Sequence, residues 1–162
     1  MSKDDADYSG SFYDWGKAVG DGSTWRTLSV GEWGYLIGAR EVNGGKGEGK
    51  SFQRATINSD ATSVYGMILY PDNYTETAKA SYTSAEWTSL EKLGCVFLPA
   101  AGSRMSAYSM VVNVGKTGKY WSKSENGVDG AYHFSFMSST MRYDTSGTRR
   151  EGYSVRLVTE VK

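Results

Sequence analysis

The sequence predicts an α+β fold built from two short helices, small antiparallel sheets and long loops. Two segments each begin with Ser or Thr followed three residues later by Glu, which is a helix-start pattern. The second half of the chain shows short stretches of alternating apolar and polar residues, which are typical of strands. Because the helical and strand patterns do not alternate regularly, a doubly wound parallel sheet is disfavoured.

The chain of 162 residues is expected to form one domain over residues 12–162. The polar and acidic residues 1–11 precede this domain, and we expect them to be a disordered N-terminal segment.

The first predicted helix starts at Ser29, with Glu32 completing a capping box, and should end near Arg40. Trp33, Leu36 and Ile37 follow the i, i+3, i+4 spacing of one buried stripe. The glycine- and lysine-rich residues 43–50 that come next predict a flexible loop.

The second predicted helix repeats this pattern, with Thr83 and Glu86 as its capping box. Trp87, Leu90 and, more weakly, Leu93 form its apolar stripe, and Gly94 stands where a helix-ending glycine belongs.

Between the helices, residues 55–73 predict two strands around a turn, the stronger one over 64–69. The run beginning at Cys95 predicts a buried strand that leads into a small-residue turn. Further strands are expected over 108–114, 118–123, 131–137, 140–143 and 153–161.

The alternation in "GAYHFSF" predicts that Tyr132, Phe134 and Phe136 face the core while His133 and Ser135 face outward. The polar residues after this strand predict a long turn, and Val155 and Leu157 are expected to return to the core.

The charge balance excludes some partners. Eighteen basic and eighteen acidic residues give a formal net charge of zero, which argues against nucleic-acid binding. No signal-peptide pattern or apolar run of about 18 residues is present, so we expect no direct membrane insertion.

The sequence offers little for catalysis, and we expect no enzyme activity, no metal and no cofactor. The single cysteine, Cys95, lies in an apolar run that predicts a buried, inert thiol. The single histidine, His133, has no nucleophile pattern beside it, and the glycine-rich loop lacks the strand–turn–helix context of a phosphate-binding loop.

Binding is better supported, because Tyr, Met and Arg are frequent contact residues and are abundant between Arg104 and Tyr153. An ordinary solvated β-face is an equal alternative on composition alone. The candidate ligand-binding residues from position and composition are Met105, Tyr108, Lys119, Lys123, Asn126, His133, Met137, Arg142, Arg150 and Glu151.

Several motifs in order, "TWRTLSVGEWGYL", "GMILYPDNY", "EWTSLEKLGCVFLPAAGSR", "GKYWSKSENGVDGAYHFSF" and "GYSVRLV", resemble a family of C-type-lectin-fold domains. Such domains stand at the C-termini of surface proteins of gut bacteria and their phages. The sequence also resembles the variable proteins of diversity-generating retroelements, in which adenine-directed mutagenesis exchanges exposed side chains.

The resemblance implies a C-type lectin fold, location on a cell surface or phage particle, and a protein or glycan ligand. "YWS" (Tyr120, Trp121 and Ser122) and "FLPAAG" would then be scaffold. The resemblance also adds to the candidate ligand-binding residues Asp129, Ser135, Ser146, Thr148 and Tyr153. The calcium-lectin motifs E-P-N and W-N-D are absent, as are the paired cysteines of formylglycine-generating enzymes. Neither activity is carried over.

The sequence therefore predicts a non-enzymatic ligand-binding domain with a variable surface. Two alternatives stay open: a fixed structural or adhesion domain of a bacterial surface lipoprotein, and a divergent enzyme of the formylglycine-generating fold.

Overall fold

The computed structural model describes residues 14–19, 24–107 and 110–160. The expectation for residues 1–11 and the candidate Tyr108 lie outside this part. The helical segments are η1 (Trp15–Val19, 3₁₀), α1 (Val30–Gly34), η2 (Tyr35–Ala39, π) and α2 (Ser84–Lys92). The strands are β1 (Arg26–Thr27), β2 (Glu41–Val42), β3 (Gly45–Lys46), β4 (Phe52–Asn58), β5 (Ser63–Leu69), β6 (Ser81–Thr83), β7 (Val96–Pro99), β8 (Ser103–Arg104), β9 (Val111–Val112), β10 (Gly118–Asn126), β11 (Gly130–Phe136), β12 (Met141–Thr148) and β13 (Leu157–Val158). The mixed α+β class is confirmed.

The first predicted helix forms as expected. The Glu32 backbone N–H donates to Ser29 Oγ at 3.1 Å, and the Ser29 N–H donates to Glu32 Oε2 at 2.8 Å. The helix passes from α1 into the π turn η2 and ends at the cap residue Arg40. Trp33 and Ile37 are fully buried, so the predicted start, end and apolar stripe are confirmed.

The second capping box also forms, between the N-cap residue Thr83 and Glu86, and α2 begins at Ser84. Leu90 is buried, and Gly94 takes the left-handed conformation (φ +90°) that ends the helix. Leu93 is 49% exposed, so its assignment to the apolar stripe is wrong. Leu93 is the C-cap residue that follows the last residue of α2, where the chain leaves the helix.

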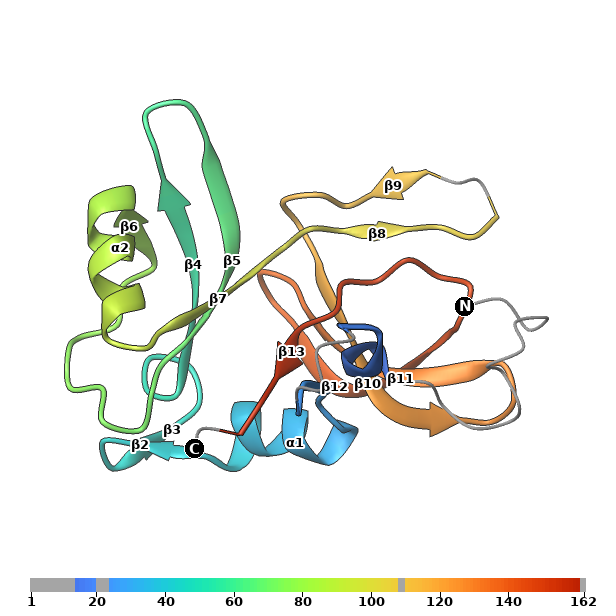
Figure 1. The fold of residues 1–162 in the computed structure, drawn as a ribbon. Helices are drawn as coiled ribbons and strands as arrows, with labels where there is room; N and C mark the ends of the chain where they lie inside the picture. Colours follow the sequence, from blue (N-terminus) through green and yellow to red (C-terminus); the bar gives the residue numbers. More distant parts are fainter. Residues whose placement is uncertain (1–13, 20–23, 108–109, 161–162) are drawn as a thin grey trace.

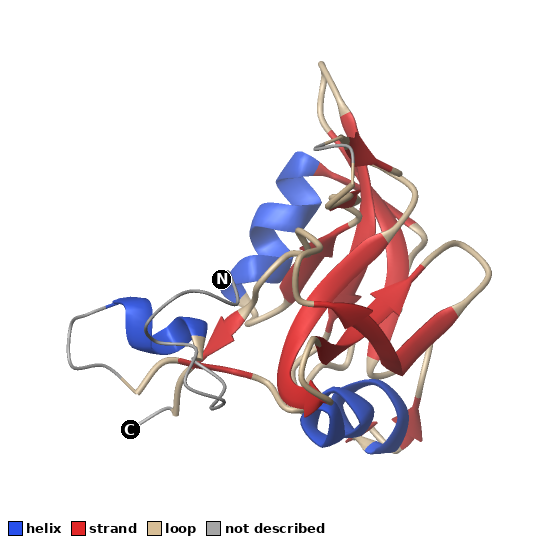
Figure 2. Cartoon of the chain, turned by 90° about the vertical axis from the view of Figure 1, so that its right-hand side faces the viewer, coloured by secondary structure: helices blue, strands red, loops and turns tan. Residues whose placement is uncertain are grey.

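Two sheets form the body of the molecule. One has four strands in the order β6-β4-β5-β7, with β4 and β6 parallel and the other pairs antiparallel. The other has three antiparallel strands in the order β10-β11-β12. Figure 1 shows α2 beside the four-stranded sheet and α1 near the three-stranded one, and Figure 2 shows the two helices well apart. The pairing of β1 with β13 brings Arg26–Thr27 beside Leu157–Val158, near the C-terminal end of the described residues.

The four-stranded sheet is covered on both faces. One face packs against α2 around a cluster of Val42, Ala55, Ile68, Tyr70, Tyr74, Tyr82, Leu90 and Cys95. The other packs against α1 and the three-stranded sheet around Leu28, Trp33, Ile37, Phe52, Met67, Leu98, Ala100, Tyr120, Phe134 and Phe136. Burial of Phe134 and Phe136 is confirmed, whereas Tyr132, Val155 and Leu157 are only half-buried.

Three predicted segments differ from the structure. The polar stretch after Met141 is not a long turn, because β12 continues to Thr148 and pairs with β11 along its length. Polar side chains are tolerated here because β12 is the edge strand of its sheet and its unpaired edge faces solvent. The strands expected over 108–114 and 153–161 shorten to β9 and β13.

The loop expected over residues 43–50 is instead partly a hairpin of β2 and β3. Asn43 (φ 47°) and Gly44 (φ 72°) supply the two positive φ angles of a tight two-residue turn.

Candidate functional site

The three-stranded sheet has an outer face, turned away from the Trp33 core. Tyr120 pairs with Phe134 on the core face, so the neighbouring pair of Trp121 and His133 lies on the opposite face. Cross-strand pairing places the following residues on this outer face: Lys119, Trp121, Ala131, His133, Ser135, Arg142, Thr145 and Gly147.

The chain that returns after β12 crosses this face. Ser154 pairs with the edge of β10, through Trp121 N to Ser154 O and Ser154 N to Lys119 O, both 2.9 Å. The ring of Tyr153 stacks on Trp121 with a centroid distance of 4.3 Å and lies 4.6 Å from His133. Lys119 Nζ lies 4.7 Å from the centroid of the same Tyr153 ring.

Tyr153 covers the centre of the outer face and leaves no room for a side chain on the neighbouring strand. A Cβ added to Gly147 would lie 2.8 Å from Tyr153 Oη. A glycine at this position therefore lets the aromatic ring reach across the sheet. Tyr153 is half-buried, and this burial raises the pKa of its phenol.

The prediction that His133 is exposed is wrong. Strand alternation places it on the outer face as expected, but Trp121 and Tyr153 enclose it and leave 2% of it exposed. Burial, with a further contribution from Lys119, lowers the pKa of His133 to about 4. Its Nδ1 has no hydrogen-bond partner among the described residues. His133 is therefore neutral at pH 7 and belongs to a second, smaller packed layer.

The other described candidates are accessible to different degrees. The half-buried ones are Lys119, Lys123, Ser135, Glu151 and Tyr153. The exposed ones are Met105, Asn126, Asp129, Met137, Arg142, Ser146, Thr148 and Arg150.

A polar hollow of about 330 Å³ lies at the end of the three-stranded sheet, where the β10–β11 turn meets the end of β12. Ser146 and Thr148 pair with Tyr132 and Gly130, so their side chains point to the face opposite that of His133. It brings together four candidates, Asn126, Asp129, Ser146 and Thr148, around Gly130 and Gly147. Short hydroxyl, amide and carboxylate groups surround the hollow, so it can form hydrogen bonds with a polar ligand.

Backbone pairing joins this region to β8. Arg104 and Gly152 exchange two hydrogen bonds of 2.9 Å each, and the Glu151 carboxylate accepts 3.3 Å hydrogen bonds from the N–H and Oγ of Ser106. The loop that carries Met105 is therefore held beside the 150–153 segment.

Two adjacent arginines have different roles. Arg149 is anchored, because its Nε donates to Gly130 O at 3.0 Å and its guanidinium lies 3.6 Å from Glu125. Arg150 is exposed. Arg149 thus fixes the β10–β11 turn against β12, and only Arg150 is presented.

The structure does not bring every candidate together. Lys123 lies at the α1 side of β10, where its N–H donates to Leu28 O at 2.9 Å. Met137 belongs to the β11–β12 turn, which Arg54 of β4 holds through the carbonyl oxygens of Met137 and Ser138 at 3.0 and 2.8 Å. These two candidates lie apart from the polar hollow.

The sequence analysis missed several exposed apolar residues. Met110, Val111 and Val114 are 59%, 60% and 64% exposed, and they lie on or beside β9 of the projecting β8–β9 hairpin (Figure 1). Their apolar run predicted a strand, but whether a strand packs on the body or projects from it depends on distant contacts. Together with Met105 they extend the accessible surface with apolar side chains suited to contact.

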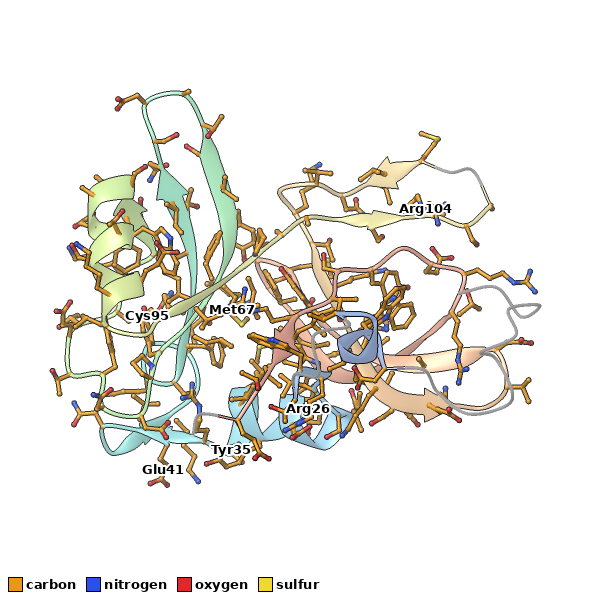
Figure 3. All side chains as sticks on the ribbon, viewed as in Figure 1. Arg26, Tyr35, Glu41, Met67, Cys95 and Arg104 are labelled. Atoms are coloured by element: carbon orange, nitrogen blue, oxygen red, sulfur yellow. The ribbon has the colours of Figure 1, made fainter. Side chains whose placement is uncertain are left out.

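The single cysteine lies away from the β8–β9 hairpin. Cys95 lies beside α2, far from Arg104 of β8 (Figure 3), and burial raises the pKa of its thiol to about 11. The predicted burial of Cys95 is confirmed. Within the described ranges, no three His, Cys, Asp or Glu side chains are grouped so that they could hold a metal ion. The helices of the same ranges are all too short or too polar to cross a bilayer.

No protein-family model matches this chain, and neither a curated protein nor a solved structure matches it.

Proposed function

We propose that this chain is a non-enzymatic ligand-binding domain with a C-type lectin fold that presents a variable surface. In this proposal it is the variable protein of a diversity-generating retroelement. It acts on a cell surface or phage particle and binds a protein or glycan.

One observation carries the proposal: exposed side chains and buried structural side chains occupy separate positions on two paired strands. Arg142, Ser146 and Thr148 of β12 are exposed, whereas Phe134 and Phe136 of the paired strand are buried. Exposed replacements typically change stability by about 0.5 kcal/mol or less, while truncating a buried Phe costs about 3–5 kcal/mol. A population of variants can therefore keep this fold while its surface changes.

The fold assignment rests on the quoted motifs together with the architecture. Two capped helices and small, mainly antiparallel sheets are compatible with what that resemblance implies. Aromatic and arginine side chains are the usual anchors of an interface, and Arg142 and Arg150 are both exposed. Display of many copies would raise avidity where one site binds weakly.

The test is to sequence this gene and its flanks across many cells of one population and score substitutions codon by codon. We expect them to concentrate at adenine-rich codons of exposed positions such as Asn126, Arg142 and Arg150. Codons for Trp121 and Phe134 should be unchanged.

An even spread of substitutions, or flanks without a reverse-transcriptase gene and a template repeat, would refute diversification. The chain would then be a fixed structural or adhesion domain, which is the alternative that the sequence left open.

A second test needs no genomic context. A display library that randomises Asn126, Arg142, Ser146, Thr148 and Arg150 should remain largely protease-resistant. A matched library that randomises the buried residues Tyr120, Trp121, His133, Phe134 and Phe136 should be largely digested. Equal loss of resistance in both libraries would contradict the separation of surface from scaffold.

A further inference from the structure

A cavity of about 270 Å³ is lined by residues of α1, the π turn η2, the end of β5, the start of β7 and the C-terminal strand β13. Figure 1 shows β13 above α1. None of the candidate residues of the outer face lines the cavity. Its apolar wall consists mainly of Leu28, Leu36, Leu69, Val96, Leu157 and Val158. Trp33, Arg40 and Arg156 add nitrogen donors to this wall.

Two of these donors are buried without an acceptor. Trp33 Nε1 and Arg40 Nε have no hydrogen-bond partner among the described residues, and the two residues are 0% and 8% exposed. The other Arg40 nitrogens are bonded, Nη1 to Asp72 Oδ1 at 2.9 Å and Nη2 to Ser51 O at 3.0 Å. Buried donors are rarely left unpaired in native proteins, so an acceptor from outside the described chain is called for.

The charge of the cavity wall is positive. Arg156 is exposed and has no ion-pair partner among the described residues, while Arg40 shares its charge with the largely exposed Asp72. An anionic acceptor gains from both guanidinium groups, whereas a cation is repelled and a neutral apolar molecule leaves the buried donors unpaired.

The size of the ligand follows from the volume. Water occupies about 30 Å³ per oxygen in the liquid, so 270 Å³ corresponds to roughly nine non-hydrogen atoms. We propose that this cavity binds a small carboxylate with about eight carbon atoms in all, the carboxyl carbon included. Its apolar body contacts the leucine and valine side chains, and the carboxylate accepts hydrogen bonds from the indole and guanidinium groups.

Octanoate is the probe for the test, followed through the Trp33 indole N–H and Arg40 Nε–H signals in ¹⁵N NMR spectra. We expect both signals to shift saturably, and 1-octanol and octylammonium to bind at least about tenfold more weakly because they lack the carboxylate. No saturable shift would show that the cavity holds only water. Equal binding of 1-octanol would show that the carboxylate is not recognised, and either result overturns the proposal.

Two variants test separately the contribution of the Arg156 charge and that of the cavity volume to octanoate binding. Arg156→Gln should raise the octanoate dissociation constant about tenfold, while the matched control Lys116→Gln, an exposed lysine outside the cavity, should leave it unchanged. Val96→Phe should fill the cavity and abolish binding while a cooperative thermal transition is retained. If Val96→Phe does not fold, the comparison of Arg156→Gln with Lys116→Gln decides, because both side chains are exposed. Unchanged affinity in Arg156→Gln would overturn the proposal.

Discussion

The burial of His133 predicts a specific pH dependence of stability. The imidazole is 2% exposed and its pKa is lowered to about 4, against an ordinary value of 6.5. Below pH 6.5 the unfolded chain therefore binds a proton that the folded chain does not bind. Stability should fall as the pH decreases from about 6.5 to about 4, and it should be independent of this group above that range.

The magnitude follows from the two pKa values. Each unit between them is worth about 1.4 kcal/mol, so the free energy of unfolding at pH 5 should be about 2 kcal/mol lower than at pH 7.5. Glu32 does not interfere, because its hydrogen bonds to Arg26 and Ser29 lower its pKa to about 2 and its contribution is lost only below about pH 4.5. His133 is the only histidine in the chain, so this pH window isolates one group.

The assay is urea denaturation followed by tryptophan fluorescence at pH 7.5, 6 and 5, for the parent protein and for His133→Phe. The variant should lose the dependence between pH 7.5 and 5, whatever its absolute stability. In parallel, the single imidazole signal in the NMR spectrum of the folded protein should not titrate above pH 5. Titration near 6.5, or the same pH slope in both proteins, would refute the inferred burial of a neutral imidazole.

Three further predictions concern packing, capping and the outer face. Gly118→Ala should lower the free energy of unfolding by about 2–3 kcal/mol, because its Cβ would lie 2.2 Å from the ring of the buried Phe136. The control Gly38→Ala, whose Cβ would meet nothing within 4 Å, should not be destabilising, and equal urea midpoints for the two variants would contradict this prediction. Thr83→Ala should lower the free energy of unfolding by about 1 kcal/mol, because the N-cap of α2 is lost. The measurement is the melting temperature, and an unchanged value would show that the cap does not stabilise the fold. Tyr153→Ala should destabilise the fold by about 2–4 kcal/mol, because the Tyr153 ring stacks on Trp121. Arg150→Ala should change the urea midpoint little because Arg150 is exposed, and a larger loss of stability in Arg150→Ala than in Tyr153→Ala would make Arg150 part of the scaffold.

The position of Tyr153 changes the design of a binding experiment. A combined alanine replacement that includes Tyr153 would mix loss of binding with loss of stability, because the ring covers both Trp121 and His133. Replacements limited to Arg142 and Arg150 report on binding alone, since both side chains are exposed.

The sequence alone determined the features whose physics is local. The capping boxes at Ser29 and Thr83 join residues three positions apart, so their hydrogen bonds form wherever the helix packs. Gly94 ends α2 for the same reason, since its left-handed conformation is a property of one residue. Strand alternation likewise placed Phe134 and Phe136 in the core.

Only the tertiary structure decided what covers each face. Alternation placed His133 outward, but the ring of Tyr153, twenty positions later, closes over it and makes it a core residue. The same dependence on distant partners made the polar residues after Met141 a strand, because β11 supplies the hydrogen-bonding edge. It also formed the cavity between Trp33, Arg40 and Arg156, which come together only when β13 returns beside β1. Periodicity fixes the side on which a residue lies, whereas burial depends on which distant segment packs against that side.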